Sequence, residues 1–199
     1  MAVILLKLSA PMQSWGTELK LKDHPTDSYP SKSGVIGMIA SAEGRKRDDS
    51  IDDLVKLKFG VRVDRSGTIC YDYQTAWIRK SISATSPMKS YVGNRGFLCD
   101  AIFTIALEGK LELLSEIEFN LHHPANALYC GRRGFPVNAD FVVGVFEEDI
   151  RTALYGHGYT EDMRIFLEVE SGGDRLVKDN PVSFDFHKRQ WNYRMIKEF

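Results

Sequence analysis

The residues whose types and spacing could do chemistry are mainly arginines, lysines and aromatic side chains gathered in a few short segments. Residues 129–136 read Tyr-Cys-Gly-Arg-Arg-Gly-Phe-Pro. Glycines let a backbone approach a phosphodiester chain, and Arg132 and Arg133 can each fork onto phosphate oxygens. A tight turn with solvated arginines is the alternative interpretation. The chemistry that this segment suggests is binding of a phosphate-bearing polymer.

The longest such segment covers residues 73–99, which contain no Asp or Glu although the chain has 27 acidic residues in 199. Its candidate contact residues are Tyr73, Trp77, Ile78, Arg79, Lys80, Lys89, Tyr91 and Arg95. An arm of this composition can stack on bases and neutralise phosphates. The alternative is a solvated hairpin whose aromatic side chains pack on the body of the protein.

Two further segments are basic. Residues 30–34 precede apolar positions spaced as on a helix, so we expect a helix that begins near Ser33, with Ser33 as its N-cap. Free amides, hydroxyls and Lys32 would form an anion site there, or Ser33 would simply cap the helix. Residues 187–194 interleave basic and aromatic side chains; they could touch RNA, dock a partner or form an edge strand.

No nucleophile and base pair stands out, so we expect no catalytic residues. Cys70, Cys99 and Cys130 are widely spaced and the five histidines lack chelating spacing, which predicts ordinary thiols, no metal site and no cofactor. The apolar run at residues 3–8 is too short for a signal peptide or a membrane span. We therefore expect a cytoplasmic protein.

The net charge of −1 excludes a protein that coats nucleic acid by bulk positive charge. It leaves room for a local basic groove, because binding follows the distribution of charge rather than its sum.

These segments must be held in position by the strands and helices of the fold. Periodicity predicts strands at residues 3–8, 59–64 (half-exposed), 102–107 and 128–132, and helices at about 33–44 and 113–121. The order is that of an α+β, ferredoxin-like βαββαβ core, as in RNA-recognition (RRM-like) folds. The third strand lacks the basic-Gly-aromatic run of such folds, so ordinary stacking across the sheet is not expected.

About 35 residues, 66–100, separate the two middle strands, where a plain hairpin needs only a short turn. We expect a core domain over residues 1–140, with a long β-hairpin thumb inserted at about 70–99. A small β-rich C-terminal extension over 141–199 would pack on that core.

Six segments in chain order resemble the CasD family of type I-E CRISPR Cascade subunits, within the RAMP superfamily. They are residues 6–16, 30–39, 59–64, 72–75, 98–101 and 129–133. The sequence departs from the usual pattern of that family at two places. Gly134-Phe135-Pro136 stands where the family usually has Ser-Cys-Pro, and Gln74 stands where it usually has His.

The resemblance implies a RAMP fold with a thumb and a non-catalytic subunit that caps the 5′ handle of the crRNA. Implied partners are the CasC backbone subunit, the large Cascade subunit and target DNA, the last contacted through the assembled complex. The expected RNA contacts are Gln13, Ser14, Trp15, Lys32, Ser33, Arg62, Arg132, Arg133 and the thumb residues named above. The rivals are an endoribonuclease that processes precursor crRNA, as in the type I-C branch, and a purely structural subunit.

Overall fold

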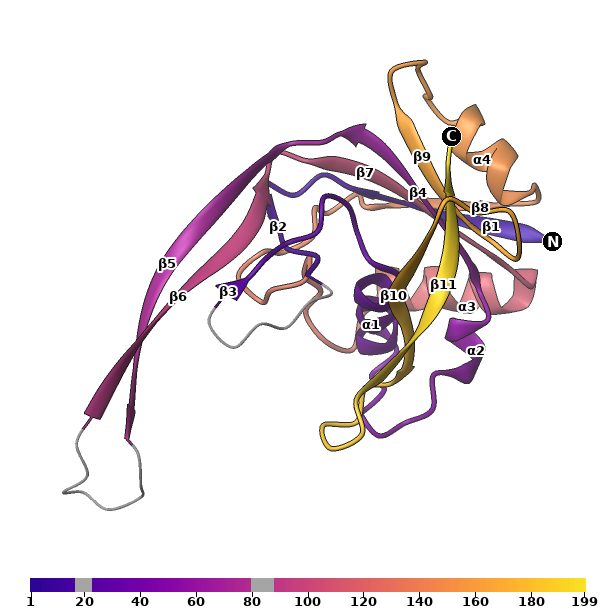
Figure 1. Cartoon of the computed structure of the whole chain (residues 1–199). Coiled ribbons are helices and arrows are strands. Elements are labelled where there is room, and N and C mark those ends of the chain that lie inside the picture. Colours follow the sequence, from indigo (N-terminus) through magenta and orange to yellow (C-terminus); the bar gives the residue numbers. More distant parts are fainter. Residues whose placement is uncertain (17–22, 80–87) are drawn as a thin grey trace.

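The computed structural model describes residues 1–16, 23–79 and 88–199, with the side chains of Asp23 and Ile78 left out. It is a mixed α/β protein with a seven-stranded sheet in its body and a second, four-stranded sheet that reaches far out from it (Figure 1). The seven-stranded sheet has the order β10-β11-β9-β4-β7-β1-β8, and all its neighbouring strands are antiparallel.

The elements of the body have these bounds. The strands are β1 (Ala2–Leu8), β4 (Lys58–Arg65), β7 (Ile102–Gly109), β8 (Val142–Phe146), β9 (Arg164–Val169), β10 (Arg175–Ser183) and β11 (Gln190–Glu198). The helices are α1 (Lys32–Ala42), α2 (Asp52–Val55), α3 (Leu111–His122) and α4 (Ile150–Gly156). The strands expected near 3–8, 59–64 and 102–107 and the helix expected at 113–121 are confirmed.

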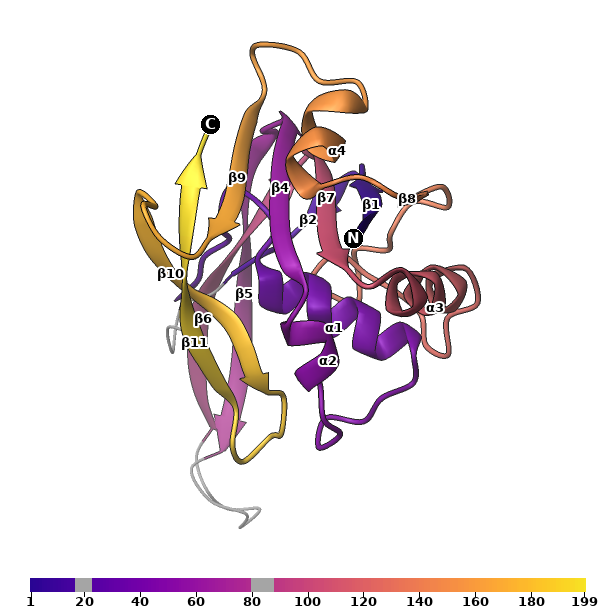
Figure 2. The same ribbon diagram turned by 90° about the vertical axis from the view of Figure 1, so that its right-hand side faces the viewer.

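Helices cover both faces of the sheet at its middle strands (Figure 2). Alternate residues of β1 divide between the faces, as the two-residue period of a strand requires. Ile4 and Leu6 belong to the larger apolar cluster beneath α1 and α3. Val3 and Leu5 belong to a smaller cluster with Leu154 of α4. The central strands are therefore buried on both sides.

This double cover explains why the expectation of a half-exposed strand at 59–64 is wrong. Phe59 and Val61 face the larger cluster, while Gly60 and Arg62 face α4. A Cβ atom on Gly60 would lie 2.8 Å from Leu154 Cδ1. Sequence periodicity suggests solvent on that side because the covering helix lies about 90 residues further along the chain.

Two other expectations are also wrong. Residues 128–132 form no strand, since only an isolated bridge joins Tyr129 to Pro136. The strand after α3 is instead β8, which pairs with β1. Helix α1 begins at Lys32 and its N-cap is Ser31 rather than Ser33, because the Ser31 side chain accepts a hydrogen bond from the Gly34 amide at 3.3 Å.

The region 141–199, expected as a small extension, supplies α4 and the four strands β8 to β11 of the seven-stranded sheet. Strand β9 pairs with β4 in the middle of the sheet, and β10 and β11 form a hairpin at one edge, beside α1. This part of the chain is thus continuous with the body.

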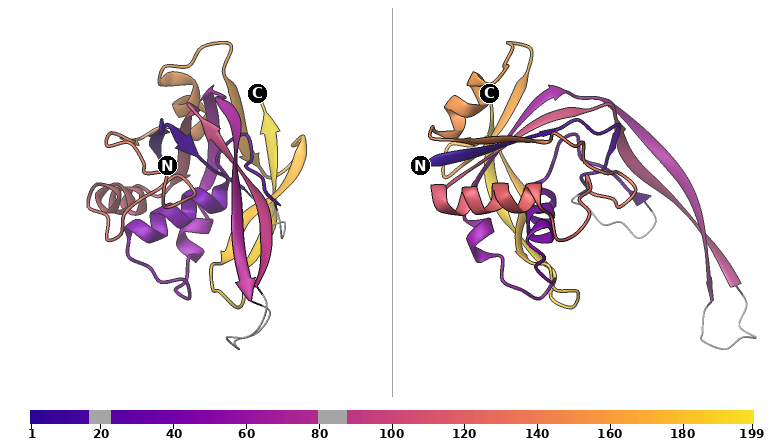
Figure 3. Two further views of the ribbon diagram at one scale, coloured as in Figure 1. Left: turned by 90° about the vertical axis from the view of Figure 1, so that its left-hand side faces the viewer. Right: turned by 180° about the vertical axis from the view of Figure 1, so that it is seen from behind.

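The expected insertion is a long two-stranded ribbon, called the thumb below. Its strands β5 (Thr68–Arg79) and β6 (Met88–Cys99) pair in unbroken antiparallel register. The right-hand view of Figure 3 shows the ribbon curving away from the body. At its base, β2 (Met12–Gln13) and β3 (Asp23–His24) add to the free edge of β6. This second sheet joins the loop after β1 to the thumb.

Candidate nucleic-acid interface

The thumb presents two chemically different faces. Side chains at alternate positions of a strand share a face, and ladder partners lie opposite each other on that face. Tyr71, Tyr73 and Trp77 therefore share one face, with 67%, 67% and 64% of their surfaces exposed. The opposite face carries Lys89 and Arg95, both exposed. We call the first face aromatic and the second cationic, although Asp72 lies opposite Arg95 on the second.

Further thumb candidates fall on both faces or beyond the described ranges. Tyr91 lies on the cationic face, and the Lys89 ammonium is 5.7 Å from the centre of its ring. Arg79 is exposed at the end of β5, on the aromatic face. The backbone of Ile78 belongs to β5, and its side chain is not described. Lys80 lies outside the described residues.

The segment 129–136, called the Gly-Arg loop below, packs against the base of the thumb. Arg132 donates a 2.8 Å hydrogen bond to the carbonyl of Gly96, and its guanidinium lies 5.5 Å from the ring of Phe135. Burial first and the neighbouring Arg95 second lower the pKa of Arg132, but an arginine stays charged in proteins. Arg132 therefore anchors the loop and also adds positive charge beside Arg95.

Arg133 differs from its neighbour, because it is exposed and, within the described part of the chain, no hydrogen bond or ion pair involves its side chain. It is the arginine of this loop that is free to meet a ligand.

The backbone of the Gly-Arg loop fits closely against the loop after β1. The Ser14 amide donates to the Cys130 carbonyl at 3.0 Å. Gly131 has φ +84°, and a Cβ atom there would lie 1.7 Å from the Ser14 carbonyl oxygen. Only glycine fits this approach, so the glycine serves contact within the protein as well as any contact with a ligand.

Gln13 and Trp15, both expected RNA contacts, are buried. The Gln13 amide group donates to the carbonyls of Leu8, Ala10 and Ala101 at 3.3, 3.4 and 2.9 Å. Its oxygen accepts the Trp15 indole N–H at 3.0 Å. The polar groups of Gln13 and Trp15 therefore bond within the protein and stabilise the loop after β1. Ser14 is half-buried and donates to the Gly96 carbonyl at 3.1 Å.

Lys32, an expected RNA contact, is only 1% exposed. Its ammonium lies 3.2 and 3.0 Å from the two carboxylate oxygens of Glu168 on β9. Burial is the main influence on this group and lowers the pKa of Lys32, against the opposing effect of Glu168. The side chain therefore stabilises the packing of α1 on the sheet instead of meeting a ligand.

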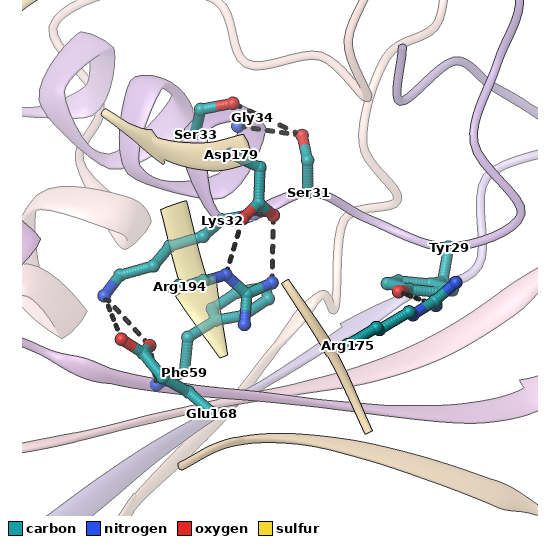
Figure 4. A network of polar contacts seen from close by, with 10 residues as sticks. All are labelled: Tyr29, Ser31, Lys32, Ser33, Gly34, Phe59, Glu168, Arg175, Asp179 and Arg194. Atoms are coloured by element: carbon teal, nitrogen blue, oxygen red, sulfur yellow. Dashed lines mark hydrogen bonds and ion pairs between the residues drawn. The ribbon is translucent and has the colours of Figure 1, made fainter. Parts of the chain in front are cut away.

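The first turn of α1 already holds an anion, which is the carboxylate of Asp179 on β10. Asp179 accepts the Lys32 backbone N–H at 2.8 Å and pairs with Arg194 of β11 (Figure 4). Helix N-termini favour negative charge. The anion site expected from the sequence is thus occupied by a side chain nearly 150 residues away. Ser33 is half-buried beside it, with its hydroxyl 3.5 Å from that of Ser31.

Arg62, another expected RNA contact, is enclosed by α4. Its guanidinium donates to the carbonyls of Leu154 and His157 at 2.6 and 2.7 Å and to the Thr104 hydroxyl at 3.1 Å. It also pairs with Asp64. All of these partners lie within the body, so Arg62 has a structural role here.

A cavity of about 210 Å³ lies between the loop after β1, the start of α1 and the β10–β11 hairpin. It is lined by Ser14, Trp15, Gly16, Ser31, Ser33, Gly34, Gly131, Lys178, Phe184, Arg189 and Trp191. The sequence analysis singles out the segment that contains Arg189 and Trp191, but it does not predict where that segment lies in the fold. It misses Lys178 and Phe184, because nothing in their local sequence shows that β10 and the turn after it fold back beside α1.

Over the described residues, no helix is long and apolar enough to cross a membrane. The same residues contain no group of three or more His, Cys, Asp or Glu side chains that could hold a metal ion.

A mixed α/β body with a projecting basic and aromatic hairpin matches one class of known proteins, the CRISPR-associated Cas proteins. One chain of a solved CRISPR RNA-guided surveillance complex is similar with a TM-score of 0.82 and 30% identity, covering 99% of this chain and 89% of that chain. The crystal structure of a Cas protein is similar with a TM-score of 0.74 and 34% identity, covering 99% and 93%.

The sequence comparisons narrow that class. The family described as CRISPR-associated protein (Cas_Cas5) matches residues 3–197. The CRISPR system Cascade subunit CasD of Escherichia coli (strain K12) is 31% identical over 210 residues, which are 94% of this chain and 93% of that protein. The chain belongs to the Cas5 family of CRISPR-associated proteins.

Proposed function

We propose that this chain is a non-catalytic subunit of a type I-E Cascade complex and that it binds and caps the 5′ handle of the crRNA. The observation that carries the proposal is the exposed thumb, which has no acidic residue over 73–99 and whose base meets the Gly-Arg loop. The similarity to a Cascade subunit over nearly the whole chain supports it.

The core that carries these parts is, in this proposal, a ferredoxin-like RAMP domain. The four neighbouring strands β4-β7-β1-β8 and the helices α1 and α3 follow one another in a βαββαβ order along the chain. The thumb is inserted between β4 and β7, which are the two middle strands of that order. The core would hold the RNA-binding parts at fixed positions.

The two faces of the thumb suggest a division of work on single-stranded RNA. Lys89 and Arg95 would neutralise phosphates, as would Arg133 at the base. Tyr73 and Trp77 would stack on bases or close the path of the guide. Phosphate contacts fix position without reading sequence, so recognition of the handle requires bases held in pockets.

The absence of catalysis is part of the proposal, and the chemistry of one position supports it. Gln74 stands where the resemblance leads us to expect a histidine, and its amide donates to the Asp72 carboxylate. An amide cannot accept a proton as a general base at neutral pH.

Capping the handle would fix the point from which CasC subunits assemble, next to the large subunit. Target DNA would be contacted through the assembled complex.

Incubation of the purified chain with precursor RNA, with and without divalent metal, tests this function. We expect the RNA to be bound through the 5′ handle and to stay intact. Specific cleavage at the repeat would show that the chain is an endoribonuclease. If the chain does not bind the handle either by itself or within the complex, the remaining alternative is a purely structural subunit.

A further inference from the structure

The cavity between α1 and the β10–β11 hairpin has the chemical character of a nucleotide site. None of the residues that line it is acidic. Two of them are cations, Lys178 and Arg189, and both are exposed. Within the described ranges, no ion pair involves either side chain. An acid-free hollow with two unpaired cations attracts an anion.

The walls of the cavity add aromatic side chains to these charges. Trp191 and Phe184 come from the hairpin, and Trp15 comes from the loop after β1. The Arg189 guanidinium lies 5.6 Å from the Trp191 ring, so the cation and the ring are already side by side. Aromatic rings bind bases of any sequence through their faces, and arginines next to them bind the phosphates.

At the start of α1, the Asp179 carboxylate already accepts the Lys32 amide and the Ser31 hydroxyl accepts the Gly34 amide. The same carboxylate is neutralised by Arg194, so it does not cancel the charge of Lys178 and Arg189. The two positive charges that line the cavity, Lys178 and Arg189, both belong to the hairpin. The cavity has a volume of only about 210 Å³, which suits part of one nucleotide and not a longer segment.

We infer that the β10–β11 hairpin forms the outer wall of a pocket for one unstacked RNA nucleotide, with its base against Trp191 and Phe184 and its phosphate on Lys178 and Arg189. This inference rests on the proposed function, since it places one nucleotide of the bound guide RNA. The pocket adjoins the Gly-Arg loop, because Gly131 lines it too. RNA that passes Arg133 would reach the hairpin next.

The first test is Lys178→Ala combined with Arg189→Ala in the full chain, with binding measured to RNA that carries the 5′ handle of the host repeat. We expect binding to weaken about tenfold or more, because the variant cannot form two charge-assisted hydrogen bonds to the phosphate. The matched control is Lys46→Ala with Arg47→Ala, which removes the same charge from exposed positions between α1 and α2. The control should keep wild-type affinity.

The second test is a cycle between Trp191→Ala and an abasic scan of the handle. At one handle position, removal of the base should weaken binding to the wild type and have little further effect on the variant. The scan stays informative even if Trp191→Ala lowers the stability of the protein, because each abasic RNA is compared with intact RNA on the same protein.

The outcomes separate this inference from the proposed function. If the wild type binds the handle while Lys178→Ala with Arg189→Ala binds as tightly as the control, the nucleotide pocket is wrong and the proposed function stands. If that variant binds RNA normally but no longer co-purifies with the complex, the hairpin is a protein interface and the inference is wrong. If the wild type does not bind the handle, both fail.

Discussion

Asp179 and Arg194 form a doubly hydrogen-bonded ion pair in the interior, with Nε–Oδ1 and Nη2–Oδ2 distances of 2.6 and 2.9 Å. The Asp179 carboxylate also accepts the Lys32 amide at the start of α1. These three hydrogen bonds tie β10 and β11 to the helix beneath them. They hold in place the hairpin that carries Lys178 and Trp191.

Replacement of Asp179 by Asn should destabilise the protein. It leaves the Arg194 guanidinium buried without a counter-charge, which typically costs about 3–5 kcal/mol in the free energy of unfolding. Denaturant unfolding of both proteins measures the difference. The control is Glu198→Gln, which removes an ion pair 3.7 Å long between two half-exposed side chains and should cost less than about 1 kcal/mol. Equal losses of stability in the two variants would contradict the anchoring role of Asp179.

Much of the fold follows from local pattern, but the buried charges do not. Apolar periodicity is enough to predict β1 and α3, and the 35 residues between the two middle strands are enough to predict an insertion there. Lys32 and Arg62 look like solvated cations because their partners, such as Glu168 and the Leu154 carbonyl, lie more than 90 residues away. A basic residue has the same local sequence whether it meets water, a carboxylate or RNA.

The close approach at the Gly-Arg loop predicts a sharp difference between two glycines. Gly131→Ala places a Cβ atom against the Ser14 carbonyl at a positive φ, so we expect a loss of about 1–3 kcal/mol in stability and weaker RNA binding. Gly134→Ala is the matched control, because nothing lies within 4 Å of its Cβ position. Thermal unfolding and RNA titration of both variants provide the readout. A Gly131→Ala variant as stable as the control would refute the packing described for this loop.

The three cysteines should react differently with iodoacetamide. Burial raises the pKa of the Cys130 thiol to about 12, so at pH 8 only about one thiol in 10,000 is ionised. Cys70 and Cys99 are half-exposed. Mass spectrometry of the native protein should therefore show alkylation of these two and protection of Cys130. Labelling in denaturant, where all three should react, is the control. Equal labelling of Cys130 in the native state would mean that it is not buried.

The aromatic face of the thumb should contribute to RNA binding without contributing to stability. Tyr73→Ala with Trp77→Ala should weaken the binding of handle-bearing RNA by about 1–3 kcal/mol for each base that loses its stacking partner. The unfolding midpoint should not change, because both rings are mostly exposed. Phe119→Ala on α3 removes another exposed ring far along the chain and serves as the control. Unchanged RNA affinity in the thumb variant would show that the aromatic face does not bind RNA.

The central claim, that this chain grips the 5′ handle, is tested most directly by titrating it with handle RNA and with a permuted sequence at several salt concentrations. We expect tighter binding of the handle. We also expect Arg132→Ala with Arg133→Ala to weaken binding and to reduce the salt slope by about 0.7 for each phosphate that is no longer neutralised. Equal binding of the two RNAs, together with unchanged affinity and slope in the variant, would contradict the claim.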